Sequence, residues 1–335
     1  MPINWNNLKD KANYYLILLI AFFIPLKKEV IAPLIILFFI ASLINRKQEL
    51  MTHINRKLLI IIGFYVIGFI SIFYGENTSN TWFNNEIKLS LFVFPTALII
   101  SNLNINKIFR PILKSFVEGT IFAIILALIN AATNYYYEHD STVFFYSHLS
   151  YFAHASYFSL YLNFSIAILY FFWFSPSKKD YIPPYLNFGI SFFFSLIILM
   201  LASKTGIITL VFVHLIGIIF WVKKYQKIKQ ASILFGALAL FISIGIYNSP
   251  QVVDRLTTMK NSILNYDGTP NSSSTIRIAV WTEATQLIIK KPILGYGVGD
   301  VSDQLTQRYK EKGFHKLAKK QLNSHNQYLQ ILIGS

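Results

Sequence analysis

Residues 186–221 read LNFGISFFFSLIILMLASKTGIITLVFVHLIGIIFW, two apolar runs that are separated only by the polar turn Ser203-Lys204-Thr205-Gly206. Each run approaches the roughly 17–25 residues that a helix needs to cross a bilayer. The turn between them is so short that the two helices must form a tight antiparallel hairpin. This stretch therefore predicts a protein built from packed, membrane-spanning helices.

Similar runs recur along the chain. Hydrophobic residues make up 54% of the 335 residues and charged residues only 13%, which is more apolar and less charged than a soluble domain. The nine apolar runs are 12–26, 29–44, 58–74, 87–103, 112–133, 154–174, 186–202, 204–221 and 231–247. We therefore expect an all-α, polytopic helical membrane protein with about nine to ten transmembrane helices and one large outward-facing helical loop.

The placement of lysine and arginine predicts the topology, because these residues gather in short cytoplasmic loops. With nine spans, fifteen of them fall on one side: Lys9, Lys11, Arg46, Lys47, Arg56, Lys57, Lys107, Arg110, Lys114, Lys178, Lys179, Lys223, Lys224, Lys227 and Lys229. The opposite short loops hold four, namely Lys27, Lys28, Lys88 and Lys204. We expect a cytoplasmic N-terminus, a transmembrane bundle over 1–247, a large outward loop over 248–324 and the start of a further, truncated span over 325–335.

Composition also excludes some functions. Half of the 30 cations lie in the cytoplasmic set, so the net charge of +15 does not indicate nucleic-acid binding. The outward loop has eleven cations against six acids, which suits an anionic ligand or a lipid headgroup, although solubility explains it equally well. The chain has no cysteine, and His139, His148 and His154 lack the spacing of a helical metal-ligand pair.

Within the outward loop, Ser274 is the expected N-cap of a helix that runs to Lys291 and stops before Pro292. Its apolar stripe at helical spacing consists of Ile276, Val280, Ala284, Leu287 and Ile288. Arg277 and Trp281, four residues apart, share a neighbouring face. This pair suits a cation–π contact or an anionic ligand, and a purely structural contact would use the same residues.

Gly295, Gly297 and Gly299 alternate in the next segment. Glycines at such spacing let backbone amides approach a phosphate closely. A tight turn along the membrane surface would need the same residues. No βαβ pattern surrounds them, so they do not form a dinucleotide-binding fingerprint.

Ser324 and Gln327 have the spacing of a capping box. Ser324 is then the expected N-cap of the last helix and His325 its first residue. A helix N-terminus attracts anions and disfavours an imidazolium, so we expect a neutral His325 that can accept a proton.

Two more ionisable residues lie in the spans or at their edges. Lys204, at the tip of the hairpin, either snorkels to headgroups or meets an anion at the membrane surface. His214 lies inside the run 204–221, where we expect a hydrogen bond between helices, although an ionisable residue within a span is also a functional candidate.

Together these motifs resemble the O-antigen ligase and Wzy-type O-antigen polymerase superfamily of bacterial envelope glycosyltransferases. The resemblance covers about residues 195–335 and follows the family's order: the Ser203–Gly206 turn, Arg277 and Trp281, the alternating glycines, and His325-Asn326. Arginine is common in the family in place of Lys204. The family's histidine motif ends in a glycine that would be residue 336, so we expect the chain to be C-terminally truncated.

The resemblance implies transfer of a glycan from an undecaprenyl-diphosphate carrier to an acceptor hydroxyl, on the periplasmic face of the bacterial inner membrane. It implies that His325 is the catalytic base, and that Lys204 and Arg277 bind the diphosphate. Candidate glycan or phosphate contacts are Gly295, Gly297, Gly299, Trp281 and Asn326. The carrier supplies an activated leaving group, so neither a metal nor another cofactor is expected.

Several alternatives remain open from the sequence. The acceptor is a hydroxyl of lipid A-core, of a growing polysaccharide or of a protein. A flippase or transporter of lipid-linked glycans would also be polytopic and basic, and a non-catalytic membrane scaffold is the third class.

Overall fold

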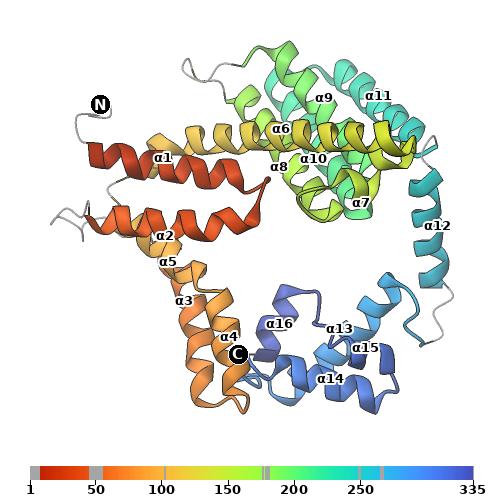
Figure 1. Ribbon diagram of the computed structural model, residues 1–335. Coiled ribbons are helices and arrows are strands. Elements are labelled where there is room, and N and C mark those ends of the chain that lie inside the picture. Colours follow the sequence, from red (N-terminus) through yellow and green to blue (C-terminus); the bar gives the residue numbers. More distant parts are fainter. Residues whose placement is uncertain are drawn as a thin grey trace. The chain divides into compact units, whose positions relative to one another are not determined.

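The computed structural model describes residues 8–44, 56–101, 103–175, 177, 182–247, 250–264 and 268–334. Within these ranges the structure is helical and contains no strand (Figure 1), which confirms the expected all-α class. The helices are α1 (Leu8–Phe23), α2 (Lys28–Ile44), α3 (Arg56–Ile70), η1 (Ser71–Phe73), α4 (Thr78–Ile87), α5 (Ser90–Ile100), α6 (Ile105–Glu138), η2 (Ser141–Phe144), α7 (Tyr146–Leu149), α8 (Ala155–Phe174), α9 (Pro184–Met200), α10 (Lys204–Tyr225), α11 (Ile228–Tyr247), α12 (Pro250–Leu264), α13 (Ser273–Lys290), α14 (Val301–Glu311), α15 (His315–Lys319) and α16 (Gln327–Gly334). Four of the expected cytoplasmic cations, Arg46, Lys47, Lys178 and Lys179, lie outside the described residues.

A helix occupies each of the nine apolar runs, but several of these helices are short. α1, α2, α3 and α9 contain 16, 17, 15 and 17 residues, and at 1.5 Å per residue they reach about 22–26 Å of the roughly 30 Å hydrocarbon core. Among the described residues, α6, α8 and α10 are long and apolar enough to cross a membrane, and α4 with α5 would add one span bent by 41°. The count of nine to ten spans is not confirmed and stays a prediction.

By its internal contacts the chain forms two compact units. Unit 1 contains Met1–Leu37 and Leu103–Leu256, and unit 2 contains Phe38–Asn102 and Thr257–Ser335. The expected boundaries at residues 248 and 324 refer to the two sides of a membrane, so they stay predictions.

The core of unit 1 lies where α8 packs against α6, α9 and α10. Gly206 lets the first turn of α10 approach α8 closely, because a β-carbon there would lie only 2.5 Å from the Cβ of Ser159. The Asn163 side-chain amide donates to the carbonyls of Ser159 at 2.8 Å and Gly206 at 3.0 Å. The predicted tight hairpin is confirmed, since α9 ends at Met200 and α10 begins at Lys204.

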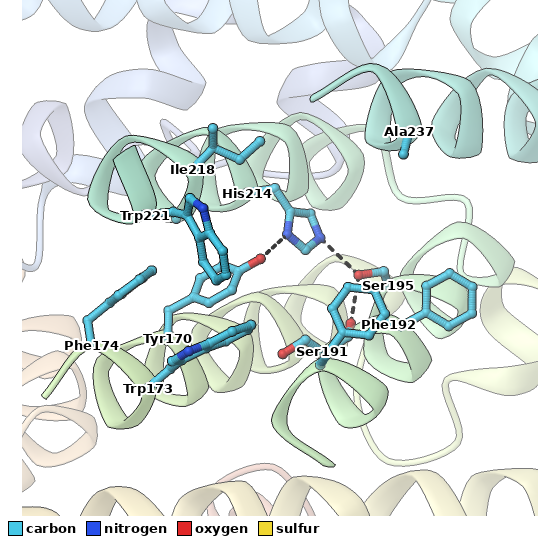
Figure 2. A pocket seen from close by; sticks show the side chains of 12 residues that line it. Tyr170, Trp173, Phe174, Ser191, Phe192, Ser195, His214, Ile218, Trp221 and Ala237 are labelled. Carbon is cyan, nitrogen blue, oxygen red and sulfur yellow. Dashed lines mark hydrogen bonds between the residues drawn. The ribbon is translucent and has the colours of Figure 1, made fainter. Parts of the chain in front are cut away.

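Farther along the same helices, buried and half-buried polar side chains join α8, α9 and α10 (Figure 2). The Tyr170 hydroxyl lies 2.5 Å from Nδ1 of His214, and the Ser195 hydroxyl lies 3.0 Å from its Nε2. Both ring nitrogens therefore have a partner on a neighbouring helix. The expectation that His214 forms hydrogen bonds between helices is confirmed.

In unit 2, α13, α14 and α16 surround one apolar core. Its buried members include Val280, Ala284, Leu305, Tyr309 and Ile333. The Tyr309 hydroxyl donates to the Leu322 carbonyl at 3.0 Å. Burial, and next the negative charge of Glu283, raise the pKa of the Tyr309 phenol, so it stays a neutral donor.

An ion pair ties α13 to α14 at this core. Glu283 is only 4% exposed, and its Oε2 lies 2.6 Å from Nη2 and 2.9 Å from Nε of Arg308. A carboxylate this deeply buried is tolerated because the guanidinium compensates its charge and fills its hydrogen bonds. Nη1 of Arg308 also contacts the more exposed Glu311 at 3.1 Å.

We predict that Arg308→Leu lowers the free energy of unfolding by about 3–5 kcal/mol, because it leaves the Glu283 carboxylate buried and unpaired. Denaturant titration of the purified protein in detergent, followed by tryptophan fluorescence, measures this loss. The double variant Glu283→Leu/Arg308→Leu should recover most of it, since no buried charge remains. Equal stability of Arg308→Leu and the unchanged protein would contradict this account.

Candidate active site

The helix that carries Arg277 begins with a reciprocal cap. The Ser272 hydroxyl accepts from the Thr275 N–H at 3.2 Å, and the Thr275 hydroxyl accepts from the Ser272 N–H at 2.8 Å. The N-cap is therefore Ser272, and the expectation that Ser274 caps this helix is wrong. Ser272 is the favoured cap because the Thr275 hydroxyl, three residues later, accepts a hydrogen bond from the Ser272 N–H, so that two N–H groups at this helix end have partners.

α13 then presents two distinct faces. The predicted apolar stripe is confirmed, since Val280, Ala284 and Leu287 are buried in the core of unit 2. Arg277 is exposed, and Trp281, one turn later on the same face, is 40% exposed. No cation–π contact joins this pair within the described residues; the indole binds elsewhere.

The indole of Trp281 fixes the chain next to His325. Its Nε1–H donates to the Ser324 carbonyl at 2.9 Å. Ser324 is 1% exposed, and its hydroxyl lies 2.8 Å from the Asn326 carbonyl and 2.9 Å from Oε1 of Gln330. Both of the residues that flank His325 are thus tied into a buried hydrogen-bond network.

The last helix begins later than expected. Oδ1 of Asn326 accepts from the N–H groups of Tyr328 at 3.0 Å and Leu329 at 3.4 Å, so Asn326 is the N-cap and α16 starts at Gln327. The predictions that Ser324 caps this helix and that His325 is its first residue are wrong. Asparagine caps at least as well as serine, and the Ser324 hydroxyl is already engaged.

His325 therefore lies just before the N-cap, in a strained conformation. Its φ is +47°, in the left-handed region, which costs energy for a residue with a β-carbon. Its N–H donates to Oδ1 of Asn323 at 3.0 Å, and its side chain is exposed. Strain of this kind persists where the surroundings over-determine the backbone, and it is frequent at functional sites.

Within unit 2, the fold brings three of the predicted site residues together. Trp281 bonds to the residue before His325, and Arg277 lies one helical turn from Trp281. The exposed Arg277 thus lies one turn before the indole that bonds to the residue preceding the exposed His325. Lys204 belongs to unit 1.

Lys204 is the first residue of α10 and is half-buried. The Ser203 hydroxyl caps this helix by accepting from the Gly206 N–H at 3.3 Å. A lysine in the first turn adds to the positive end of the helix dipole instead of opposing it. The position is unfavourable for the helix alone and favourable for attracting an anion.

The alternating glycines are buried in unit 2. Gly295 and Gly297 have φ values of +59° and +99°, which favour glycine. A β-carbon at Gly297 would lie 2.9 Å from the Cα of Gly75, and one at Gly299 would overlap Thr81. Close packing of the chain accounts for these glycines, and their contact with a glycan or phosphate stays a prediction.

Asp300, directly after the glycines, forms a buried contact that no sequence motif predicts. Its carboxylate accepts from the N–H of Glu76 at 2.8 Å and of Asn77 at 2.6 Å, just before α4 begins. It is 5% exposed. This bond joins segments more than two hundred residues apart, at 76 and 300, so no local sequence pattern reveals it.

We predict that Gly299→Ala lowers the free energy of unfolding by about 1–3 kcal/mol, because the added methyl must displace α4. Gly189→Ala is the matched control: Gly189 lies inside α9 with nothing within 4 Å of an added β-carbon, so it should gain about 0.5–1 kcal/mol. Thermal and denaturant unfolding in detergent compare the two. Equal effects of both substitutions would exclude tight packing as the reason for Gly299.

Comparison with known proteins agrees with the resemblance seen in the sequence. Residues 189–335 match the family model described as O-Antigen ligase. No curated protein and no solved structure matches the chain. The matched part extends from α9 through α16 and includes Lys204, Arg277 and His325. Residues 189–335 of this chain are therefore similar to the O-antigen ligase family.

Proposed function

We propose that this protein is a membrane glycosyltransferase that moves a glycan from an undecaprenyl-diphosphate carrier to an acceptor hydroxyl on the periplasmic face of the inner membrane. The similarity of residues 189–335 to the O-antigen ligase family model supports the reaction class. The observation that carries the residue assignment is the exposed His325, held at positive φ between Ser324 and Asn326. The acceptor is lipid A-core, a growing polysaccharide or a protein hydroxyl.

In the proposed reaction His325 is the general base. The acceptor oxygen attacks the anomeric carbon as its proton passes to an imidazole nitrogen, and the bond from that carbon to the diphosphate oxygen breaks. The bonding electron pair leaves with the diphosphate, so a direct displacement inverts the anomeric configuration. The hydrogen-bonded backbone at His325 favours this role, because general-base catalysis requires the nitrogen within hydrogen-bond reach of the hydroxyl.

Two cations stabilise the departing diphosphate in this proposal. Arg277 is exposed and one turn from Trp281, and its planar guanidinium can bind two phosphate oxygens at once. Lys204 contributes a point charge at the N-terminus of α10, where the helix dipole has the same sign. Positive charge placed where the leaving group becomes negative lowers the barrier directly.

The remaining proposed site residues contact the glycan or the phosphate. Trp281 uses its indole N–H for Ser324, which leaves the partly exposed ring for a sugar face. Asn326 and the glycines at 295, 297 and 299 are the other proposed contacts. The carrier supplies both the activated sugar and the leaving group, so the reaction needs neither nucleotide nor metal.

His325→Asn is the sharpest test of the base. Asparagine tolerates the left-handed conformation and forms hydrogen bonds, but it does not take up a proton at neutral pH. We expect the rate of glycan transfer to fall by about 10²- to 10⁴-fold, measured with purified lipid-linked donor in membranes of a strain that lacks the gene, at equal protein level.

His325→Gly controls for the backbone, because glycine removes the strain at positive φ without supplying a base. His325→Gly should be as stable as the unchanged protein and as inactive as His325→Asn. Transfer at the unchanged rate in either variant would make His325 a structural residue. Donor that accumulates only in the cytoplasmic leaflet would indicate a flippase instead.

Arg277→Gln should lower kcat/KM by about 10- to 100-fold, the loss expected when one charged hydrogen-bond donor is removed from the diphosphate. Lys290→Gln is the matched control, since Lys290 is an exposed cation in the last turn of the same helix. Competition by a soluble diphosphate ester measures binding separately. Equal activity of the two variants would remove Arg277 from the site.

A further inference from the structure

An apolar groove runs along unit 1 between α8 and α10. Its volume is about 600 Å³, and its walls include Phe171 and Phe174 from α8 and Ile216 and Phe220 from α10. Ile216 and Phe220 are each 52% exposed, so the groove is open along its flank. Lys223 and Lys224 lie at one end of it.

The groove is about as long as one leaflet of a bilayer. From Val213 to Lys224, α10 rises by about 16 Å, roughly half of the ~30 Å hydrocarbon core. Its basic end lies at the C-terminus of α10, and Lys204 is the first residue of the same helix. The groove is therefore separate from the proposed site at Lys204 and does not depend on the proposed function.

The cations at the basic end differ in their hydrogen bonds. Lys224 Nζ donates to the Phe174 carbonyl at 2.9 Å, and Arg110 Nη1 donates to the Ser175 carbonyl at 2.9 Å. These two bonds neutralise the negative C-terminal end of α8. The Lys223 ammonium is exposed and has no hydrogen bond or ion pair within the described residues.

We propose that this groove binds an anionic phospholipid, with the phosphate at Lys223 and Lys224 and an acyl chain along α8 and α10. The charge complementarity selects an anionic headgroup, because positive charge beside the membrane attracts acidic lipids. The length selects a phospholipid over a polyprenyl carrier, because a phospholipid chain extends from headgroup to midplane and fills a groove that spans one leaflet. In the expected topology this end faces the cytoplasm.

Native mass spectrometry of the full chain in detergent, titrated with phosphatidylglycerol and with phosphatidylcholine of the same acyl chains, tests the proposal. Phosphatidylglycerol should bind more tightly. Lys223→Gln should weaken phosphatidylglycerol binding about fivefold, the loss expected for one lysine at an anionic headgroup, and leave phosphatidylcholine unchanged. Ala167→Phe, which adds a large side chain to the apolar lining of the groove, should weaken the binding of both lipids.

Lys229→Gln is the matched control, because Lys229 is an exposed lysine in the first turn of α11 and does not line the groove. It should bind both lipids as the unchanged protein does. Equal binding of the two lipids to the unchanged protein, or unchanged phosphatidylglycerol binding by Lys223→Gln, overturns the proposal. Displacement of phosphatidylglycerol by an equimolar amount of undecaprenyl phosphate would assign the groove to a polyprenyl carrier and also overturn it.

Discussion

Backbone N–H and C=O groups that leave water must find partners inside the protein, and in a bilayer only regular structure supplies them along a whole segment. The apolar runs of this chain form helices, in which the backbone N–H and C=O groups pair with one another. Where the backbone is irregular, side chains take over the pairing. Around His325, the bonds come from Asn323, Asn326 and the indole of Trp281.

Because side chains bond to the backbone here in place of helical hydrogen bonds, the chain around His325 adopts one specific conformation. A histidine within a helix would have the orientation that the helix imposes. Outside it, at φ +47°, the backbone at His325 is held by the bond from its own N–H to Asn323 and by the bond from the Trp281 indole to the Ser324 carbonyl. The site is therefore only as rigid as α13, whose Trp281 supplies one of them and whose Glu283 is anchored to Arg308.

Local signals predicted the helices better than their ends. Ser274 and Ser324 were reasonable caps by spacing, yet Ser272 and Asn326 cap the two helices. Ser272 caps α13 because it pairs reciprocally with Thr275. Ser324 does not cap α16 because its hydroxyl is hydrogen-bonded to Gln330. Glu283, three residues after Val280, lay within the apolar stripe, and a charge at such a place is a sign of a buried ion pair.

The all-α class, the hairpin at Ser203–Gly206, the buried face of α13 and the similarity to the O-antigen ligase family could all be predicted from the amino-acid sequence, because they depend on local composition, periodicity and short motifs. The partners of the buried polar groups could not be predicted in this way and are seen only in the folded protein. Asp300 reaches Glu76 and Asn77, Trp281 reaches Ser324, and Glu283 reaches Arg308. Such bonds satisfy groups that are distant in the chain, and their choice depends on which segments the folded core brings within about 3 Å of one another.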